Sequence, residues 1–433
     1  MQAFLLAMLF TATTADYFVS EGWLPGFTKY LIEIMSAGVL LYVVAAGAQD
    51  RFRYVRSAYW LVFGSIGLTM ACSAAANHVQ AGPLFAGLRN FLQAIPLFLL
   101  PAVVAFSDKQ IMTQLKLLLG ISLLQLPLAV HQRMATLARA GVTGDQTYGT
   151  LMISSFLSIF LICGISLLVG LYLRKLISLR TTILLFLILI VPTTINETKG
   201  TLLFFPIAVI TVFLVGAKPG TRFKNVMLAI VFLLSFVAIF IPIYDRLIQV
   251  RAYPTTISEF FSTPGRLEGY LFKRNAQIGT TEEVGRMDTI IVPLVELAKD
   301  PVTLAFGVGP GNASKSSLGP KFTGAYFYLL GPFLFTAFAL IVSELGLFGL
   351  GLVIVLFALI FGDCRRVANS DNPLRSAIAL GWSGVTVTML VGITYKNMIP
   401  AAGLSYLFWY LSGLIAAERM RMVSAQSRMG PQV

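Results

Sequence analysis

Long apolar runs recur along the whole chain, and they limit its fold more than any other feature. A run of about 20 apolar residues can cross a bilayer as an α-helix. Only 12% of the residues are charged, about half the share in soluble domains. The sequence therefore predicts an all-α polytopic membrane protein with about twelve spans. These are residues 2–16, 30–48, 58–77, 84–106, 117–131, 150–173, 181–196, 200–217, 225–244, 331–361, 376–395 and 398–416.

Basic residues are unevenly distributed between the two sets of loops. Of the 32 Lys and Arg residues, 17 fall in loops on one side, whereas the short loops on the other side hold only Lys29, Arg133, Arg139, Lys199 and Lys396. Cytoplasmic loops carry the excess of positive charge in membrane proteins. We therefore expect both termini in the cytoplasm. The net charge of +13 follows from this pattern, so it does not indicate nucleic-acid binding.

One long polar segment, residues 245–330, interrupts the apolar pattern. It separates residues 1–244, with nine predicted spans, from residues 331–418, with three, and residues 419–433 form a predicted cytoplasmic tail. The alternation of the loops predicts that the segment lies outside the cytoplasm. Because a loop of this length without structure is unusual, we expect it to be ordered and functional.

Residues 285–311 form the most distinctive part of this loop. Arg286 and Asp288 open an expected amphipathic helix, which breaks at Asp300-Pro301 and is followed by a glycine turn, Gly307-Val308-Gly309-Pro310-Gly311. The expected helix sets Ile290, Val292, Leu294, Val295 and Leu297 against Asp288, Glu296 and Lys299. Glycines permit turns that bring backbone N–H groups close to a ligand. The planar fork of Arg286 suits a pair of phosphate oxygens, although a solvated surface arginine is the simpler interpretation.

Two further charged residues fall at membrane depth or at its edge. Lys199 lies between two apolar runs, where it is either a snorkelling side chain or a cation at the mouth of a cavity. Glu344 lies well inside the tenth predicted span and needs a partner or a proton. We expect Arg89, which enters the fourth span from the same side, to be that partner; a role for Glu344 as catalytic base is the alternative.

Metal and cofactor motifs are absent from the sequence. The three cysteines, Cys72, Cys163 and Cys364, have no metal-ligand spacing, and His78 and His131 are isolated. The sequence has no Asp-x-Asp pair and no nucleotide-binding glycine loop. We therefore expect no cofactor and no metal site.

Four segments resemble the superfamily of bacterial O-antigen ligases and O-antigen polymerases. The segment from Gly285-Arg286 through Asp300-Pro301 to Gly307-Val308-Gly309 resembles its loop signature, and Glu344-Leu345-Gly346-Leu347-Phe348-Gly349 resembles the opening of its late span. Thr198-Lys199-Gly200 and Gly149-Thr150 resemble two shorter family motifs. Where the ligases have a histidine before the late-span glutamate, this chain has Phe335. The resemblance therefore favours a polymerase of the exopolysaccharide or O-antigen kind.

This resemblance implies a metal-independent glycosyltransferase of the bacterial inner membrane. Its substrate would be a glycan carried on polyprenyl (undecaprenyl) diphosphate, with a chain-length regulator as a further partner. Arg286 and Lys199 would stabilise the departing diphosphate, with Arg89 as a third cation. Arg89, Gly307, Gly309, Gly311 and Glu344 would form the binding site. Asp288, Glu197 and Asp145 are the candidates for the base.

Two other functions fit the same sequence. A ligase that moves the glycan to lipid A core differs in the acceptor alone. A flippase or secondary transporter for lipid-linked glycans would explain the spans and the intramembrane charges, but not the long structured external loop.

Overall fold

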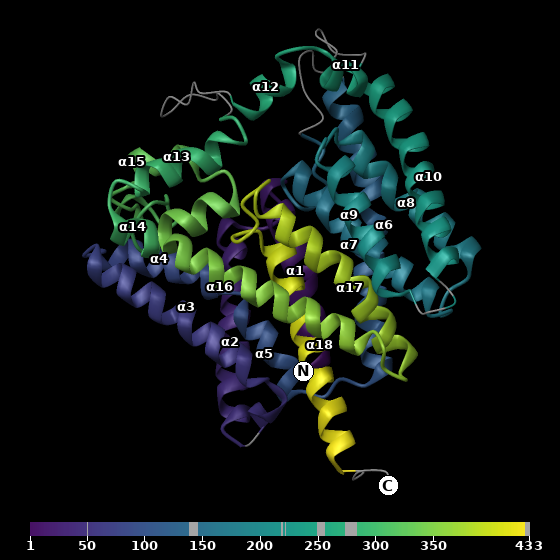
Figure 1. Ribbon diagram of the computed structural model, residues 1–433, viewed down its shortest axis with the longest axis horizontal. Coiled ribbons are helices and arrows are strands. Elements are labelled where there is room, and N and C mark those ends of the chain that lie inside the picture. Colours follow the sequence, from purple (N-terminus) through teal and green to yellow (C-terminus); the bar gives the residue numbers. More distant parts are fainter. Residues whose placement is uncertain are drawn as a thin grey trace.

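The structure is a bundle of helices, in agreement with the expected all-α fold. The computed structural model describes residues 1–49, 51–137, 146–217, 220, 222–248, 256–272 and 284–428, and all statements below concern these residues. Figure 1 shows long helices side by side, with the short helices α11 and α12 at the upper end and both termini toward the lower end. The helices outside the loop are α1 (Gln2–Ser20), α2 (Leu31–Gly47), α3 (Ser57–Ala76), α4 (Ala81–Leu92), α5 (Ile95–Val103), α6 (Asp108–Leu137), α7 (Ser154–Leu173), α8 (Leu179–Ile195), α9 (Thr201–Val215), α10 (Arg222–Ile248), α16 (Ala337–Val367), α17 (Pro373–Gly392) and α18 (Ala402–Arg428). The loop holds α11 (Ile257–Ser262), α12 (Arg266–Leu271), α13 (Asp288–Leu297), α14 (Pro301–Phe306) and α15 (Phe327–Leu330), and short 3-10 turns are η1 (Gly26–Tyr30), η2 (Arg51–Tyr54), η4 (Pro320–Phe322) and η5 (Gly331–Phe333).

Eight of the described helices are long and apolar enough to cross a membrane. They are α1, α2 extended by η1, α3, α6, α7, α10, α16 and α17. α4 and α5 together make a ninth candidate, bent by 46° between the two helices. α8 and α9 are apolar but shorter. The chain is therefore a multi-pass helical membrane protein with eight or nine helices of spanning length in its described part.

Several predicted boundaries differ from the observed ones. The fourth predicted span, 84–106, is two helices, because the chain bends after Leu92 and α5 begins at Ile95, with Pro96 in its first turn. The tenth begins at Ala337 rather than at residue 331, because Thr336 caps α16 by accepting a hydrogen bond from the Ala339 amide at 3.1 Å. The predicted tail from residue 419 is the continuation of α18 as far as Arg428.

Helices α7 and α17 lie at the centre of the bundle. In each of them 78% of the spanning window is buried, compared with 22% in α10. Glycine allows their close approach: a Cβ at Gly170 would lie 2.3 Å from the Ala377 carbonyl oxygen, and one at Gly381 would lie 2.7 Å from Leu167 Cα. Small residues permit such backbone contact between membrane helices.

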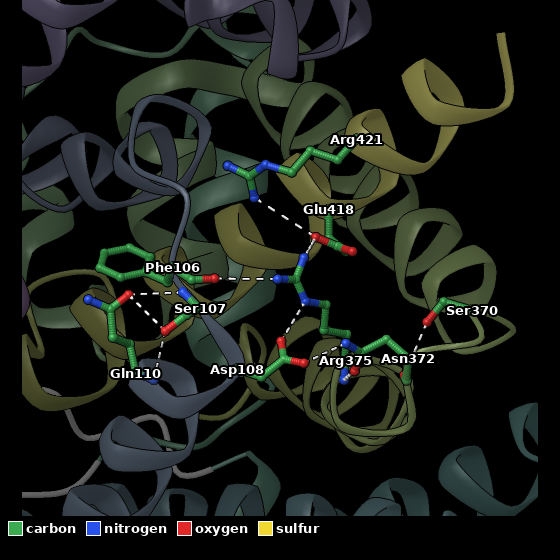
Figure 2. A network of polar contacts seen from close by, with 9 residues as sticks. All are labelled: Phe106, Ser107, Asp108, Gln110, Ser370, Asn372, Arg375, Glu418 and Arg421. Carbon is green, nitrogen blue, oxygen red and sulfur yellow. Dashed lines mark hydrogen bonds and ion pairs between the residues drawn. The ribbon is translucent and has the colours of Figure 1, made fainter. Parts of the chain in front are cut away.

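A network around Arg375 joins three helices (Figure 2). Arg375 Nε donates to Asp108 Oδ1 at 3.0 Å, and the same guanidinium forms an ion pair with Glu418. Asn372 Nδ2 donates to Asp108 Oδ2 at 2.6 Å. These contacts connect the starts of α6 and α17 to the last part of α18, so they fix the bundle at the end where the chain finishes.

Helix α16 is broken at Gly346, where φ is 69° and ψ is −170°. The break frees backbone carbonyls that a continuous helix would use. Val308 N donates to the Ser343 oxygen at 2.8 Å, and Gly309 N donates to the Glu344 oxygen at 3.1 Å. Because unpaired carbonyls are costly at membrane depth, the loop that follows α14 is required to complete α16.

Candidate functional site

A polar cavity of about 410 Å³ lies where the loop meets the ends of the long helices. Its lining comes from the start of α7, the turn between α8 and α9, α10, α12 and the segments before α13, before α16 and after α17. The lining includes three cations, Lys199, Arg286 and Lys396, and the aromatic residues Tyr244, Tyr270, Phe335 and Tyr395. We call it the cationic cavity.

The structure brings together the two residues predicted as the main cations. Lys199 Nζ lies 5.8 Å from the centre of the Tyr270 ring, and Arg286 Cζ lies 5.6 Å from the same centre. Lys199 Nζ also lies 4.4 Å from the Phe260 ring centre. Aromatic faces attract cations and orient them without neutralising their charge. Both side chains are therefore aimed into the same space by shared aromatic neighbours.

The turn between α8 and α9 positions Lys199. The Asn196 side chain donates to the Ser154 oxygen at 2.8 Å and to Ser158 Oγ at 2.9 Å, and it accepts from Thr198 N at 3.1 Å. These bonds attach the turn to the start of α7. Glu197 has φ of 58°, a left-handed conformation that is uncommon for a residue with a side chain. The turn is thus held in one strained conformation, with Lys199 following directly.

Arg286 is positioned by α12 and by the end of α17. Its Nε donates to Tyr270 Oη at 3.3 Å, and its Nη1 donates to the Tyr395 carbonyl oxygen at 3.4 Å. Its Cζ lies 4.2 Å from the centre of the Phe335 ring. Burial, together with the nearby Tyr270, raises the pKa of Tyr395. That phenol therefore stays neutral at physiological pH and does not compete for the arginine as an anion.

Lys396 is a third cation that the sequence analysis did not assign to the site. Its Nζ lies 3.4 Å from the centre of the Phe335 ring. Backbone bonds fix its position: Ala337 N donates to the Lys396 oxygen at 3.3 Å, and Asn397 N donates to the Phe335 oxygen at 2.8 Å. A lysine at the end of a span is common. Apart from its place in a short external loop, nothing in the sequence around Lys396 indicates that it belongs to the site.

A buried ion pair lies beside the cavity. Arg133 Nη2 donates to Glu197 Oε1 at 2.5 Å, and the two side chains are only 5% and 4% exposed. Arg133 Nη2 also lies 3.3 Å from the Leu247 oxygen, which connects α6 to the end of α10. Glu197 is the carboxylate among the described lining residues of the cavity. Because Arg133 balances its charge, the three cations dominate the electrostatics of the lining.

The expected pair of Glu344 with Arg89 is wrong. Arg89 binds Glu33 instead, with its Nε donating to Glu33 Oε2 at 2.7 Å. Glu344 is 1% exposed and its Oε2 accepts a hydrogen bond from Gly311 N at 2.7 Å. Glu344 therefore stabilises the glycine turn. Neither Arg89 nor Glu344 is among the described residues that line the cationic cavity.

The glycine turn serves packing rather than the cavity. The amide of Gly307 donates to the Thr303 oxygen at 2.7 Å, and those of Gly309 and Gly311 donate to Glu344. Gly307 and Gly311 have φ of 75° and 76°. A Cβ at Gly311 would lie 1.8 Å from the Pro83 oxygen of α4. The donors that we expected to bind a ligand are used within the protein, so these three glycines hold the loop against α4 and α16.

The candidate bases have different surroundings. Asp288 begins α13 and is 2% exposed, so the expected amphipathic helix exists but its first acidic residue faces inward, whereas Val295 is 60% exposed. Asp288 Oδ2 has no hydrogen-bond partner in the described part of the chain. Glu197 is paired with Arg133. Asp145 lies outside the described residues.

Comparison of the sequence with protein-family models and with curated proteins found no match. Within the described ranges, no group of three His, Cys, Asp or Glu side chains is placed to hold a metal ion. The functional argument therefore depends on the cationic cavity and its surroundings.

Proposed function

We propose that this protein is a membrane glycosyltransferase that joins oligosaccharide repeat units carried on polyprenyl diphosphate, as an exopolysaccharide or O-antigen polymerase. The observation that supports this function is the meeting of Lys199, Arg286 and Lys396 in one cavity where the long loop meets the ends of the long helices. A diphosphate carries several negative charges, and fixed cations are the groups that stabilise it.

The proposed reaction forms one glycosidic bond and breaks one bond to phosphate. A hydroxyl oxygen of the acceptor sugar attacks the anomeric carbon of the donor glycan. The bond between that carbon and the diphosphate oxygen breaks, and its electron pair leaves with the lipid diphosphate. The hydroxyl proton passes to a base; Asp288, Glu197 and Asp145 remain the candidates.

The cations contribute by stabilising the charge that develops on the leaving group. Removal of one such donor costs about 3–4 kcal/mol in well-studied sites. Arg286 has the planar geometry for two phosphate oxygens, and Lys199, which shares the Tyr270 ring as a neighbour, supplies a point charge. Arg89, paired with Glu33 away from this cavity, is not part of this proposed group.

The proposal includes the arrangement of the chain in the membrane. In it the protein crosses the bacterial inner membrane twelve times, with α4–α5, α8, α9 and α18 added to the eight long candidates, and with both termini in the cytoplasm. The loop and the cationic cavity then face the periplasm, where lipid-linked units are joined. A chain-length regulator is the partner that this function implies.

The position of Phe335 favours a polymerase over a ligase. The centre of its ring lies 4.2 Å from Arg286 Cζ and 3.4 Å from Lys396 Nζ. The resembling ligases have a histidine there, which can take a proton. A phenylalanine cannot, so the transfer to lipid A core is the less favoured reaction.

The decisive experiment replaces Arg286 by Ala in cells and compares it with Arg266→Ala, a change at an exposed arginine of the same loop. We expect Arg286→Ala to reduce chain extension by about 100-fold or more, while single repeat units still reach the outer face. Arg266→Ala should extend chains normally. Loss of the single units from the outer face would indicate a flippase and contradict the proposed function.

A further inference from the structure

A second polar cavity, of about 500 Å³, lies next to the cationic cavity. Phe335 and Lys396 line the cationic cavity, whereas their chain neighbours Leu334 and Asn397 line the second one. The hydrogen bond from Asn397 N to the Phe335 oxygen, at 2.8 Å, joins these two segments. The two cavities therefore share one wall, made by the segment before α16 and the segment after α17.

The charges of the second cavity are nearly balanced. Its described lining contains the cations Lys29, Arg89 and Lys315 and the carboxylates Asp16 and Glu33. Both nitrogens Nε and Nη2 of Arg89 donate to Glu33, which fixes this pair across α4 and α2. We call this the mixed-charge cavity. Carboxylates and cations together offer acceptors and donors for sugar hydroxyls, in contrast to the three cations on the other side of the wall.

An apolar cavity of about 110 Å³ adjoins the mixed-charge cavity. Asn90 of α4 lines both, and chain neighbours on α16, Leu340 and Ile341, line one each. The rest of the apolar lining includes Phe357 and Trp409 from helices α16 and α18. A ligand with a polar head in the mixed-charge cavity and a hydrocarbon chain in the apolar cavity would match both surfaces.

We propose that the mixed-charge cavity binds the acceptor, a second saccharide carried on polyprenyl diphosphate, whose first isoprene carbons enter the apolar cavity. This inference rests on the proposed function, because joining two repeat units requires two lipid-linked substrates at once. The donor loses its diphosphate and needs the cationic cavity. The acceptor keeps its diphosphate and presents a hydroxyl, and the balanced, hydrogen-bonding cavity next to the cationic cavity offers donors and acceptors for it.

Two variants test this site in full-length protein in nanodiscs. Lys315→Glu reverses a charge on an exposed loop residue of the lining, and Asn90→Trp fills the junction between the polar and apolar spaces. Lys321→Glu and Phe85→Trp, at exposed positions outside the lining, are the matched controls. The acceptor probe is a saccharide joined to polyprenyl diphosphate through a methylene group at its anomeric carbon, so that it can accept but cannot donate.

We expect each test variant to raise the KM for this acceptor about tenfold, with the KM for the donor changed less than about twofold. The controls should keep both constants. Wild-type protein that joins no units would refute the proposed function itself. If the wild-type protein joins units, two results would refute the second site alone. One is an acceptor KM that is unchanged in both variants, and the other is an equal rise in the acceptor KM and the donor KM. A wild-type acceptor KM that rises with the phosphatidylglycerol content of the nanodisc would instead indicate a bilayer phospholipid in the cavity.

Discussion

Each cation of the cationic cavity lies against an aromatic ring. Lys199 contacts Phe260, and both Lys396 and Arg286 contact Phe335. The rings restrict where the charges point, but they have no formal charge to cancel them. This arrangement gives preorganised positive charge, which contributes to catalysis when negative charge develops in the transition state.

Lys396→Ala should therefore weaken chain extension even though no sequence motif marks this residue. We expect a loss of about 10- to 100-fold in kcat with lipid-linked units in nanodiscs, because one of three cations at the leaving group is removed. Lys396→Arg should retain much of the activity, and Lys321→Ala, at an exposed loop position, should retain all of it. A kcat of Lys396→Ala equal to that of the wild-type protein would show that this residue does not stabilise the leaving group.

The same cations predict a reaction that needs no divalent metal. Fixed lysine and arginine side chains can perform the charge stabilisation that Mg²⁺ performs in many diphosphate-dependent enzymes. Purified protein should therefore keep its rate of chain extension in the presence of EDTA. A rate that falls in EDTA and returns with added Mg²⁺ would show that the cations are insufficient.

Single residues differ in how far the sequence predicted where they lie. It predicted that Arg286 and Lys199 share one site, because each is a charge next to an apolar run or a distinctive loop pattern, and both line the cationic cavity. The partner of Glu344 was not, because the choice between Arg89 and the Gly311 amide depends on how the loop packs on α4 and α16. Lys396 has an ordinary sequence context, and only the approach of Phe335 shows where its charge lies.

Among the elements, the broken helix α16 connects the loop to the bundle. Gly346 is left-handed with φ of 69°, and a Cβ there would lie 2.3 Å from the Ala305 oxygen of α14. The glycine at 346 is thus required both by its own backbone and by the close packing of α14.

Gly346→Ala should destabilise the protein and release the loop. A residue with a side chain in such a conformation costs about 1–3 kcal/mol, and the clash with α14 adds to this. We expect a lower melting temperature in detergent and faster proteolysis between residues 285 and 330. Gly351→Ala, in the same helix with open space around it, is the control, and equal melting temperatures for the two variants would contradict this interpretation.

The elements also show where sequence patterns lose information. Apolar runs located the membrane helices, because burial in lipid constrains every residue of a span. They did not show that α4 and α5 are separated by a bend of 46°, since the sequence pattern of the two helices is that of one span. Nor did they show that α18 continues to Arg428, because charged residues end a span without ending a helix.

For the whole molecule, the loop and the chain ends lie apart. The loop helices α11 and α12 are at the upper end in Figure 1, and the C-terminus is at the lower end. Near that end, Asp363 of α16 forms an ion pair with Arg419 of α18 and accepts a hydrogen bond from Tyr59 Oη at 2.7 Å. With the Arg375 network (Figure 2), these contacts brace the helices far from the cationic cavity. The structure separates the two ends, but the distribution of basic loops is what assigns a side of the membrane to each.

Cysteine labelling tests this assignment. Ser262 in α11 and Ser427 near the end of α18 are both exposed, and each is replaced by Cys. The background carries Cys72→Ser, because Cys72 is exposed. The other natural cysteines, Cys163 and Cys364, are buried. A maleimide that crosses the outer but not the inner membrane should label Ser262→Cys in intact cells. It should label Ser427→Cys only after the inner membrane is opened, since the positive-inside bias predicts that the basic loops and both termini lie in the cytoplasm. Labelling of Ser427→Cys in intact cells would place the cationic cavity on the cytoplasmic side, where the joining of exported lipid-linked units could not take place.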